Sequence, residues 1–336
     1  MASELLKRSE VKEADTWNVK DMYATTEAWE NELKVITGIV DKIASYEGNV
    51  TATAENLLTV LEHLASAGEK IEKAFNYAER LFDEDQTNTT HQAMSAKVYS
   101  LYAAMGSKTA FVDPEIIAAT DETLEAFYKE LPALELYRKQ IAEIRRMKEH
   151  CLSAEMEKLL AMTAEMSQTP ADTFSILNNA DLVFPEIKDE NGEKVRITHG
   201  RYGQFLQSAD RRVRKDAFEN LYQTYKQFLN TSASLYCGNV KQQVFHAKAR
   251  KYVSSLECAV DANNVSSSVY HNLIDTVNKN LDKMHQYVSL RKKCLGVGEL
   301  HMYDIYTPMI ADVAKKISFE EAKETVLKAL APLGED

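Results

Sequence analysis

One short segment near residue 300 carries several side chains that could do chemistry. Residues 301–308 read His-Met-Tyr-Asp-Ile-Tyr-Thr-Pro. An imidazole, a carboxylate and two phenols on a non-helical segment held between helices offer hydrogen-bonding groups suited to a peptide backbone. The segment either lines a peptide-binding channel or braces a structural connection, as buried Tyr and Asp commonly do, and from composition alone we favour the second interpretation. The candidate channel residues are His301, Tyr303, Asp304 and Tyr306.

A hydrolytic zinc site would need a different pattern. It requires two imidazoles one helical turn apart, a third ligand and a carboxylate that activates the bound water. None of the eight histidines is followed by a second histidine four residues later. His271 and Asp275 could share one helix face, but they would supply two ligands at most. We therefore predict no metal ligand and no catalytic residue in this chain.

Other hydrolase and nucleotide-binding signatures are absent as well. The sequence contains no G-x-S-x-G elbow, no P-loop and no G-x-G-x-x-G. The four cysteines are widely spaced and form no C-x-x-C pair. We expect reduced thiols and a cytoplasmic location.

Charge is distributed unevenly along the chain. The formal net charge is −11, yet residues 194–251 carry 12 basic and 3 acidic side chains. The motif Asp210-Arg-Arg-Val-Arg-Lys-Asp216 is either a cationic patch for carboxylates or the capped, exposed first turn of a helix, and we favour the second interpretation. An acidic chain binds nucleic acid poorly, because phosphate neutralisation needs a concentrated basic face. No apolar run is long enough to cross a membrane.

The elements that position these residues are mostly helices. With 11 glycines and 6 prolines in 336 residues, long uninterrupted helices are favoured. Trp29, Leu33, Ile36, Val40 and Ile43 recur at helical spacing after the hydroxyls of Thr25 and Thr26, which can cap the helix. Two further apolar stripes up to about Gly106 predict an antiparallel bundle with short connections.

Beyond the bundle, the pattern predicts shorter helices and one hairpin. A helix should begin at Pro170 and run to Asn179, since proline suits a first helical turn. Residues 182–187 and 194–198 are β-rich and flank an Asn-Gly turn, which predicts a hairpin over about 182–198. One long helix should follow Ser266–Ser268, with Leu273, Ile274, Val277, Leu281, Met284 and Val288 inside, and the Ser318-Phe-Glu-Glu321 capping box should start a last helix.

Several blocks of the sequence resemble oligoendopeptidase F, a relative of the thimet-type zinc oligopeptidases, in the order expected for that family. Each block is weak alone, but their ordered succession is specific and covers essentially the whole chain. The blocks are Trp17–Tyr23, Tyr77–Asp85, Phe111–Ile116, His150–Ser153, Asn179–Phe184, Thr198–Tyr202, Asp210–Arg214, Ala247–Tyr252 and Leu290–Pro308.

The resemblance implies a mainly α fold, the N-terminal part of a two-lobed helical channel metallopeptidase. It implies residues 1–113 as an N-terminal helical bundle, 114–184 as the family's N-terminal domain, and 200–336 as the first, incomplete part of the catalytic domain. The family's substrates are oligopeptides, cut at internal bonds. Its single zinc is expected in the complete enzyme, and this chain is predicted to bind none because the His-Glu-x-x-His helix is absent.

Three hypotheses follow from this pattern. The chain is an incomplete piece of a zinc endopeptidase, which is inactive alone and exposes apolar surface on its last helix. Alternatively, it is a stand-alone helical peptide-binding protein, or a non-catalytic partner subunit of a separate catalytic chain. The plain sequence after Leu333-Gly334 favours the first hypothesis.

Overall fold

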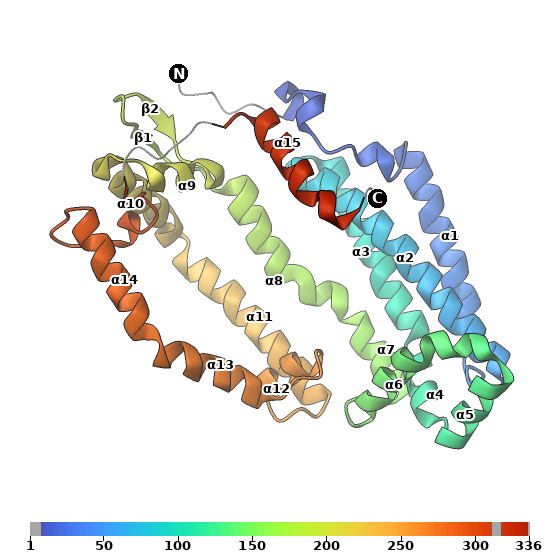
Figure 1. Ribbon diagram of the computed structural model, residues 1–336. Helices are drawn as coiled ribbons and strands as arrows, with labels where there is room; N and C mark the ends of the chain where they lie inside the picture. Colours follow the sequence, from blue (N-terminus) through green and yellow to red (C-terminus); the bar gives the residue numbers. More distant parts are fainter. Residues whose placement is uncertain (1–7, 311–316, 335–336) are drawn as a thin grey trace. The chain divides into compact units, whose positions relative to one another are not determined.

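The computed structural model describes residues 8–310 and 317–334 of the chain, and it is mainly α-helical with one small hairpin (Figure 1). This confirms the predicted fold class. The chain divides into two compact units, each assembled from separated stretches. Among the described residues, the first unit holds 8–183 and 227–271, and the second holds 184–226, 272–310 and 317–334. The predicted domains, 1–113, 114–184 and 200–336, are consecutive segments, unlike these two units. The predicted domain division stays a prediction.

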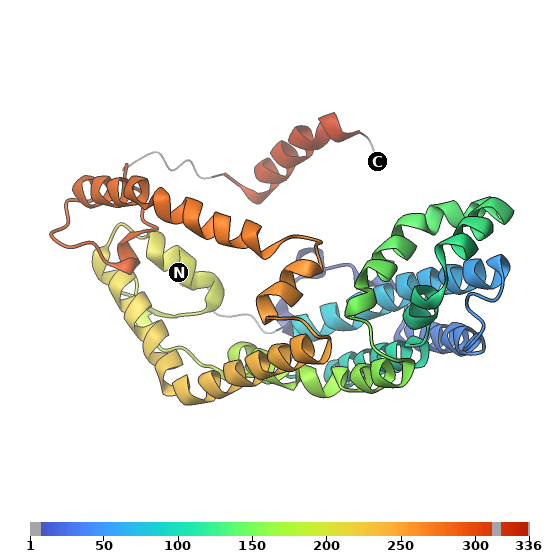
Figure 2. The ribbon, with the colours of Figure 1, turned by 90° about the horizontal axis from the view of Figure 1, so that it is seen from below.

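Three long helices pack side by side in the first unit, and Figure 2 draws them as the blue to cyan ribbons. They are α1 (Thr26–Ala44), α2 (Ala54–Glu84) and α3 (Thr89–Thr109). All five members of the predicted α1 stripe are buried, and the Trp29 indole donates a 2.9 Å hydrogen bond to the Ala74 carbonyl of α2. The Thr25 hydroxyl accepts from the Ala28 amide and caps α1. The predicted bundle is therefore confirmed.

A hydrophobic cluster joins the end of α1 and the start of α2 to shorter helices. Ile43, Leu57 and Leu61 pack there with Ile116, Leu134 and other buried side chains. The shorter helices are α4 (Val112–Ala118), α5 (Asp121–Glu130), α6 (Arg138–Arg146) and α7 (Ala154–Met162). The first unit is completed by α8 (Ala164–Ile176), α11 (Leu229–Ala249) and α12 (Ser255–Asp261).

The prediction that a helix begins at Pro170 is wrong. Helix α8 begins at Ala164, keeps Pro170 inside and continues into a π-helical turn over Leu177–Asp181. Helix α8 packs against α11 at this level, where a Cβ built on Gly238 would lie 3.5 Å from the Pro170 ring. Proline ordinarily occurs in the first turn of a helix. Here Pro170 lies inside α8 instead, where it packs against Gly238 of α11.

The predicted hairpin is present in the second unit, with shorter strands. Strands β1 (Glu186–Lys188) and β2 (Lys194–Arg196) are antiparallel, and Ile187 faces Val195 in the register. The first strand starts only after Pro185, because proline has no amide to donate. Gly192 has a φ of +81° in the turn, as the Asn-Gly sequence predicts.

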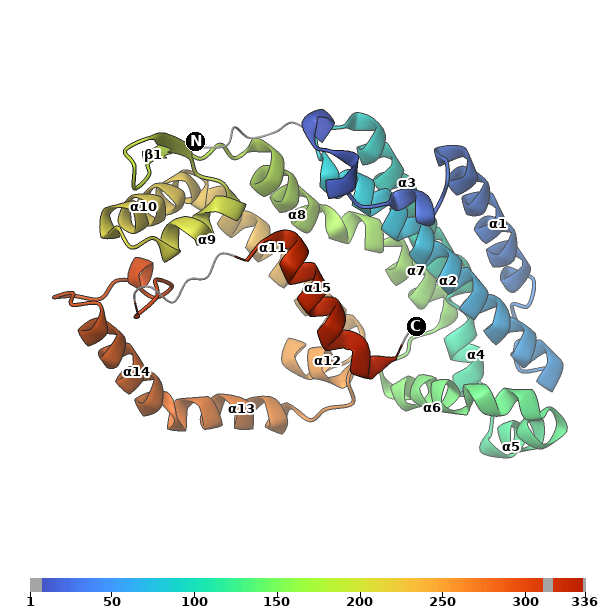
Figure 3. The same cartoon turned by 45° about the horizontal axis from the view of Figure 1, so that its top comes forward.

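The long helix predicted after Ser266–Ser268 is two helices. Helix α13 (Ser267–Lys279) ends and α14 (Leu281–Cys294) begins around Asn280, whose φ of −108° and ψ of 4° leave the helical region (Figure 3). The Asn280 amide side chain bonds to the Thr276 carbonyl, a local interaction that competes with helix continuation. The apolar side chains expected inside are largely exposed, with Leu273 at 62% and Met284 at 57%.

The remaining helices of the second unit are α9 (His199–Gln207), α10 (Arg211–Gln227) and α15 (Phe319–Leu330). Ser318 caps α15 as predicted, since its hydroxyl accepts from the Glu321 amide. Phe319 and Leu327 of α15 are exposed, as expected for its apolar side chains. Within the described part of the chain, no helix has the length and apolar character needed to cross a membrane.

Candidate functional site

The predicted segment is anchored by a buried ion pair in the second unit. Arg214 of α10 donates a 2.9 Å hydrogen bond to Oδ1 of Asp304, and both side chains are almost completely buried. Arg211, one helical turn earlier, donates from Nη2 to Oδ2 of the same carboxylate at 2.9 Å. The His301 amide donates to Oδ2 as well, at 3.0 Å. Asp304 is therefore enclosed by donors.

The protonation of Asp304 follows from these partners. Burial alone would raise the pKa of this carboxyl. Hydrogen bonds from Arg211, from the His301 amide and from Arg214 outweigh burial and lower the pKa to about 2. Asp304 is thus ionised at neutral pH and has no proton to transfer. Its charge instead anchors the segment through the two arginines.

A third arginine fixes the end of the segment. Arg291 of α14 donates to the Thr307 carbonyl at 2.6 Å and to the Asp304 carbonyl at 3.3 Å. The Thr307 hydroxyl donates to the Ser208 carbonyl, which also accepts from Arg214 at 2.7 Å. The carbonyls of Asp304 and Thr307 in this irregular segment are thereby satisfied by a buried donor.

Ring stacking orders the start of the segment. Tyr303 is buried, its ring lies 5.9 Å from Phe218 of α10, and the guanidinium of Arg211 lies 5.4 Å from its centroid. The His301 imidazole stacks on Tyr303, with ring centroids 5.0 Å apart and planes 11° from parallel. The exposed imidazole is therefore held in one orientation by a buried phenol ring.

Tyr306 lies on the surface and joins two further tyrosines. Its side chain is 61% exposed. Burial raises the pKa of the Tyr202 phenol to about 12, and the neighbouring phenols of Tyr222 and Tyr306 raise it further. Tyr222 is 53% exposed, and Tyr202 is partly buried. We call Tyr202, Tyr222 and Tyr306 the tyrosine surface.

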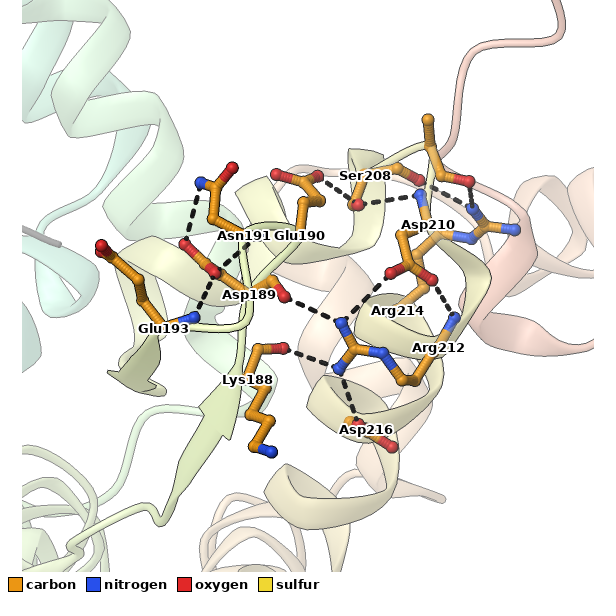
Figure 4. A network of polar contacts seen from close by, with 11 residues as sticks. Lys188, Asp189, Glu190, Asn191, Glu193, Ser208, Asp210, Arg212, Arg214 and Asp216 are labelled. Carbon is orange, nitrogen blue, oxygen red and sulfur yellow. Dashed lines mark hydrogen bonds and ion pairs between the residues drawn. The ribbon is translucent and has the colours of Figure 1, made fainter. Parts of the chain in front are cut away.

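The arginine-rich motif also holds the hairpin, as Figure 4 shows. Arg212 donates to the carbonyls of Lys188 and Asp189 at 2.9 and 2.8 Å. It also pairs with the carboxylates of Asp210 and Asp216 on its own helix. The Asp210 carboxylate accepts from the Arg212 amide at 2.8 Å and so caps the first turn of α10.

These contacts decide between the interpretations of the Asp210–Asp216 motif. It is a capped helix turn, as favoured, and Arg211, Arg212 and Arg214 are all occupied by internal partners. The turn is not exposed throughout, because the Arg214 side chain is buried against Asp304. Sequence reasoning missed the pairing of Arg211 and Arg214 with Asp304, because 90 or more positions separate the partners and no local spacing indicates it.

The four candidate residues fall into two pairs. Tyr303 and Asp304 are buried and brace the segment, whereas His301 and Tyr306 present their side chains to solvent. The bracing interpretation therefore accounts for the first pair, and a role in the channel stays a prediction for the second. Across residues 8–310 and 317–334, no cluster of three His, Cys, Asp or Glu side chains could hold a metal ion, so these residues do not fit a zinc site.

Comparison with known proteins identifies two matching segments. Residues 115–184 match the family model described as Oligopeptidase F, and residues 204–331 match that of Peptidase family M3. The second match contains the whole of the anchored 301–308 segment and the Asp210–Asp216 motif.

Full-length relatives agree with these matches. The chain is 40% identical over its whole length to Oligopeptidase PepF of Bacillus subtilis, of which it covers 50%. It is 36% identical to Group B oligopeptidase PepB of Streptococcus agalactiae, over 98% of this chain and 54% of that protein. The crystal structure of oligoendopeptidase-F from Enterococcus faecium superposes with a TM-score of 0.83 at 40% identity, over 92% of this chain and 58% of that one.

The chain thus spans about half the length of the relatives it matches. The order of the two matched segments, the identity over the whole chain and the shared helical fold all agree. The chain belongs to peptidase family M3, in its oligoendopeptidase F group.

Proposed function

We propose that this chain supplies part of the oligopeptide-binding wall of an M3 endopeptidase that hydrolyses internal peptide bonds. The family membership carries the proposal, since it rests on matches over both segments and on a shared fold. M3 peptidases are zinc enzymes. Because the sequence lacks a His-x-x-x-His pair, we infer that residues outside these 336 hold the metal and that this chain alone does not cleave peptides.

The second unit contributes to substrate binding through the tyrosine surface and His301. Phenol and imidazole groups offer hydrogen bonds to peptide carbonyls and amides, and their rings cover apolar side chains with little loss of entropy. The Arg214–Asp304–Arg211 anchor holds this segment at one place on α10, which reduces the ordering cost of binding. Support for this role comes from the exposure of Tyr306 and the rigidity of its attachment.

The domain organisation follows the family. Residues 1–113 form the helical wall, 114–184 the family's N-terminal domain, and 200–336 the first part of the peptidase domain. A cytoplasmic location accords with the four free cysteines.

Equilibrium binding of an unstructured, fluorescein-labelled nonapeptide, followed by fluorescence anisotropy, tests the binding role. Tyr306→Ala should weaken binding by roughly tenfold, because an exposed aromatic anchor is removed. Tyr236→Ala is the matched control, since Tyr236 is 72% exposed and lies on α11 of the first unit. Equal affinity of the two variants, or no saturable binding by the unaltered chain, would contradict the proposal.

A further inference from the structure

A cavity of about 480 Å³ lies within the first unit. It is bounded by α2, α3, α4, α6, α7, the start of α8 and the end of α11. Aliphatic side chains make up much of its wall, among them Leu64, Ile117, Ile144 and Leu160. This volume and the mixture of apolar walls with a few polar groups are typical of small-molecule sites.

Two of the charged groups in the cavity wall neutralise one another. Arg250 donates from Nη1 and Nη2 to the two carboxylate oxygens of Glu157, at 2.9 and 2.8 Å. Glu157 also accepts from the Leu152 amide at 2.9 Å, and Arg250 donates to the His150 carbonyl at 3.3 Å. The bidentate pair is thus fixed in place and contributes no net charge.

The Asp113 carboxylate has no such partner. Among residues 8–310 and 317–334, no hydrogen bond or ion pair reaches its side chain, which is exposed to the cavity. Burial among protein atoms raises the pKa of Asp113, and the charge of Glu157 raises it further, against the effect of Arg250. The Asp113 side chain is nevertheless exposed rather than enclosed, and among the described residues its carboxylate has no cationic partner within hydrogen-bond distance.

The other titratable groups of the cavity do not supply that cation. Burial lowers the pKa of His246, and Arg250 lowers it further, so the imidazole is neutral at neutral pH. Burial raises the pKa of the Cys151 thiol to about 11, which keeps it neutral as well. Two carboxylates against one guanidinium leave the cavity with one net negative charge at Asp113.

We propose that this cavity binds a small organic cation, with a primary ammonium at Asp113 and an apolar body against Leu64, Ile117 and Leu160. The net charge disfavours an anion. A bare metal ion lacks ligands, because the described residues contain no cluster of three suitable side chains. An ammonium on an aliphatic chain matches both the unpaired carboxylate and the apolar wall.

Isothermal titration calorimetry with a matched series of six-carbon ligands tests the proposal on the 336-residue chain. Hexylammonium should bind saturably with one site per chain, hexanol at least tenfold more weakly, and hexanoate not at all, since a charged hydrogen bond is lost or reversed. Asp113→Asn should remove the preference for the ammonium. The matched control is Asp181→Asn, an exposed aspartate outside the cavity wall.

A second variant guards against loss of folding. Ala164→Leu fills the cavity from its wall and should weaken hexylammonium and hexanol alike, while the helical circular dichroism stays unchanged. Leu-Gly-Gly and its N-acetylated form test whether the ammonium belongs to a peptide amino terminus. Binding of the free tripeptide but not of the acetylated one would indicate a peptide amino terminus, and binding of hexylammonium alone would indicate a simple amine. No saturable binding of hexylammonium, or unchanged affinity in Asp113→Asn, would overturn the proposal. The experiment does not depend on peptide hydrolysis.

Discussion

Arg214 and Asp304 lie 90 positions apart in the chain, yet they form a 2.9 Å ion pair in the interior of the second unit. The Arg214 side chain is 4% exposed and that of Asp304 is 0% exposed. This pair, with Arg211 and Arg291, attaches an irregular segment to α10 and α14. The contact therefore determines where His301 and Tyr306 are presented.

Removing the Asp304 charge should loosen the second unit. Asp304→Asn leaves Arg214 buried without its counter-ion, and we expect a loss of about 3 kcal/mol in the free energy of unfolding. Hydrogen exchange measured by mass spectrometry should show faster exchange over residues 208–214 and 299–307. Asp275→Asn, at an exposed position of α13, should leave exchange unchanged. Equal protection in both variants would show that the pair is not an anchor.

Acid should remove the same stabilisation. Because the folded pKa of Asp304, about 2, is below the usual value of 3.8, the ionised anchor stabilises the fold above pH 4. This contribution, about 2 kcal/mol, is lost as the pH falls from 4 through 2. The stability difference between the unaltered chain and Asp304→Asn, measured by urea unfolding, should therefore shrink over that range. A difference that stays constant down to pH 2 would contradict the assigned pKa.

Gly238 offers a test of the α8–α11 contact. A methyl group there would lie 3.5 Å from the Pro170 ring, an ordinary contact distance. Gly238→Ala should stabilise the first unit by up to about 1 kcal/mol, because alanine is the better helix former. Gly238→Leu should instead destabilise it, since a larger side chain has to displace Pro170. Thermal unfolding of both variants checks the opposite signs, and equal shifts would be inconsistent with close packing.

The hairpin turn depends on Gly192. Its φ of +81° disfavours a side chain, so Gly192→Ala should cost about 1 kcal/mol, whereas Gly192→Asn should cost less because asparagine tolerates this region. The free energy of unfolding by chemical denaturant and the hydrogen exchange of the β2 amides, measured for both variants, compare the two costs. Equal effects would indicate that the backbone conformation at this position is different.

The sequence was most informative where the pattern is local. The α1 stripe, the Thr25 cap and the Asn-Gly turn depend on residues a few positions apart, and all three are present as predicted. Pro170 and Asn280 were misjudged for different reasons. At Pro170 packing against Gly238 overrides the local preference, and at Asn280 a side-chain bond to Thr276 accompanies the helix break.

The site was harder to predict than the fold. Composition alone allowed both a channel and a bracing role for Asp304, and only its distant arginine partners show that it braces. The cavity at Asp113 left no signal in the sequence, because its wall is assembled from helices spread over residues 64–250. Motif spacing reports on neighbours along one element, and it carries no information on such long-range assembly.

The most direct test of the account is the zinc content and peptidase activity of this chain, measured together. We predict much less than one zinc per chain by inductively coupled plasma mass spectrometry, and no cleavage of an internally quenched fluorescent nonapeptide. The same assay on Bacillus subtilis PepF serves as the positive control, since that relative is twice as long as the region matched. One tightly held zinc per chain, with turnover that a chelator abolishes, would contradict the account.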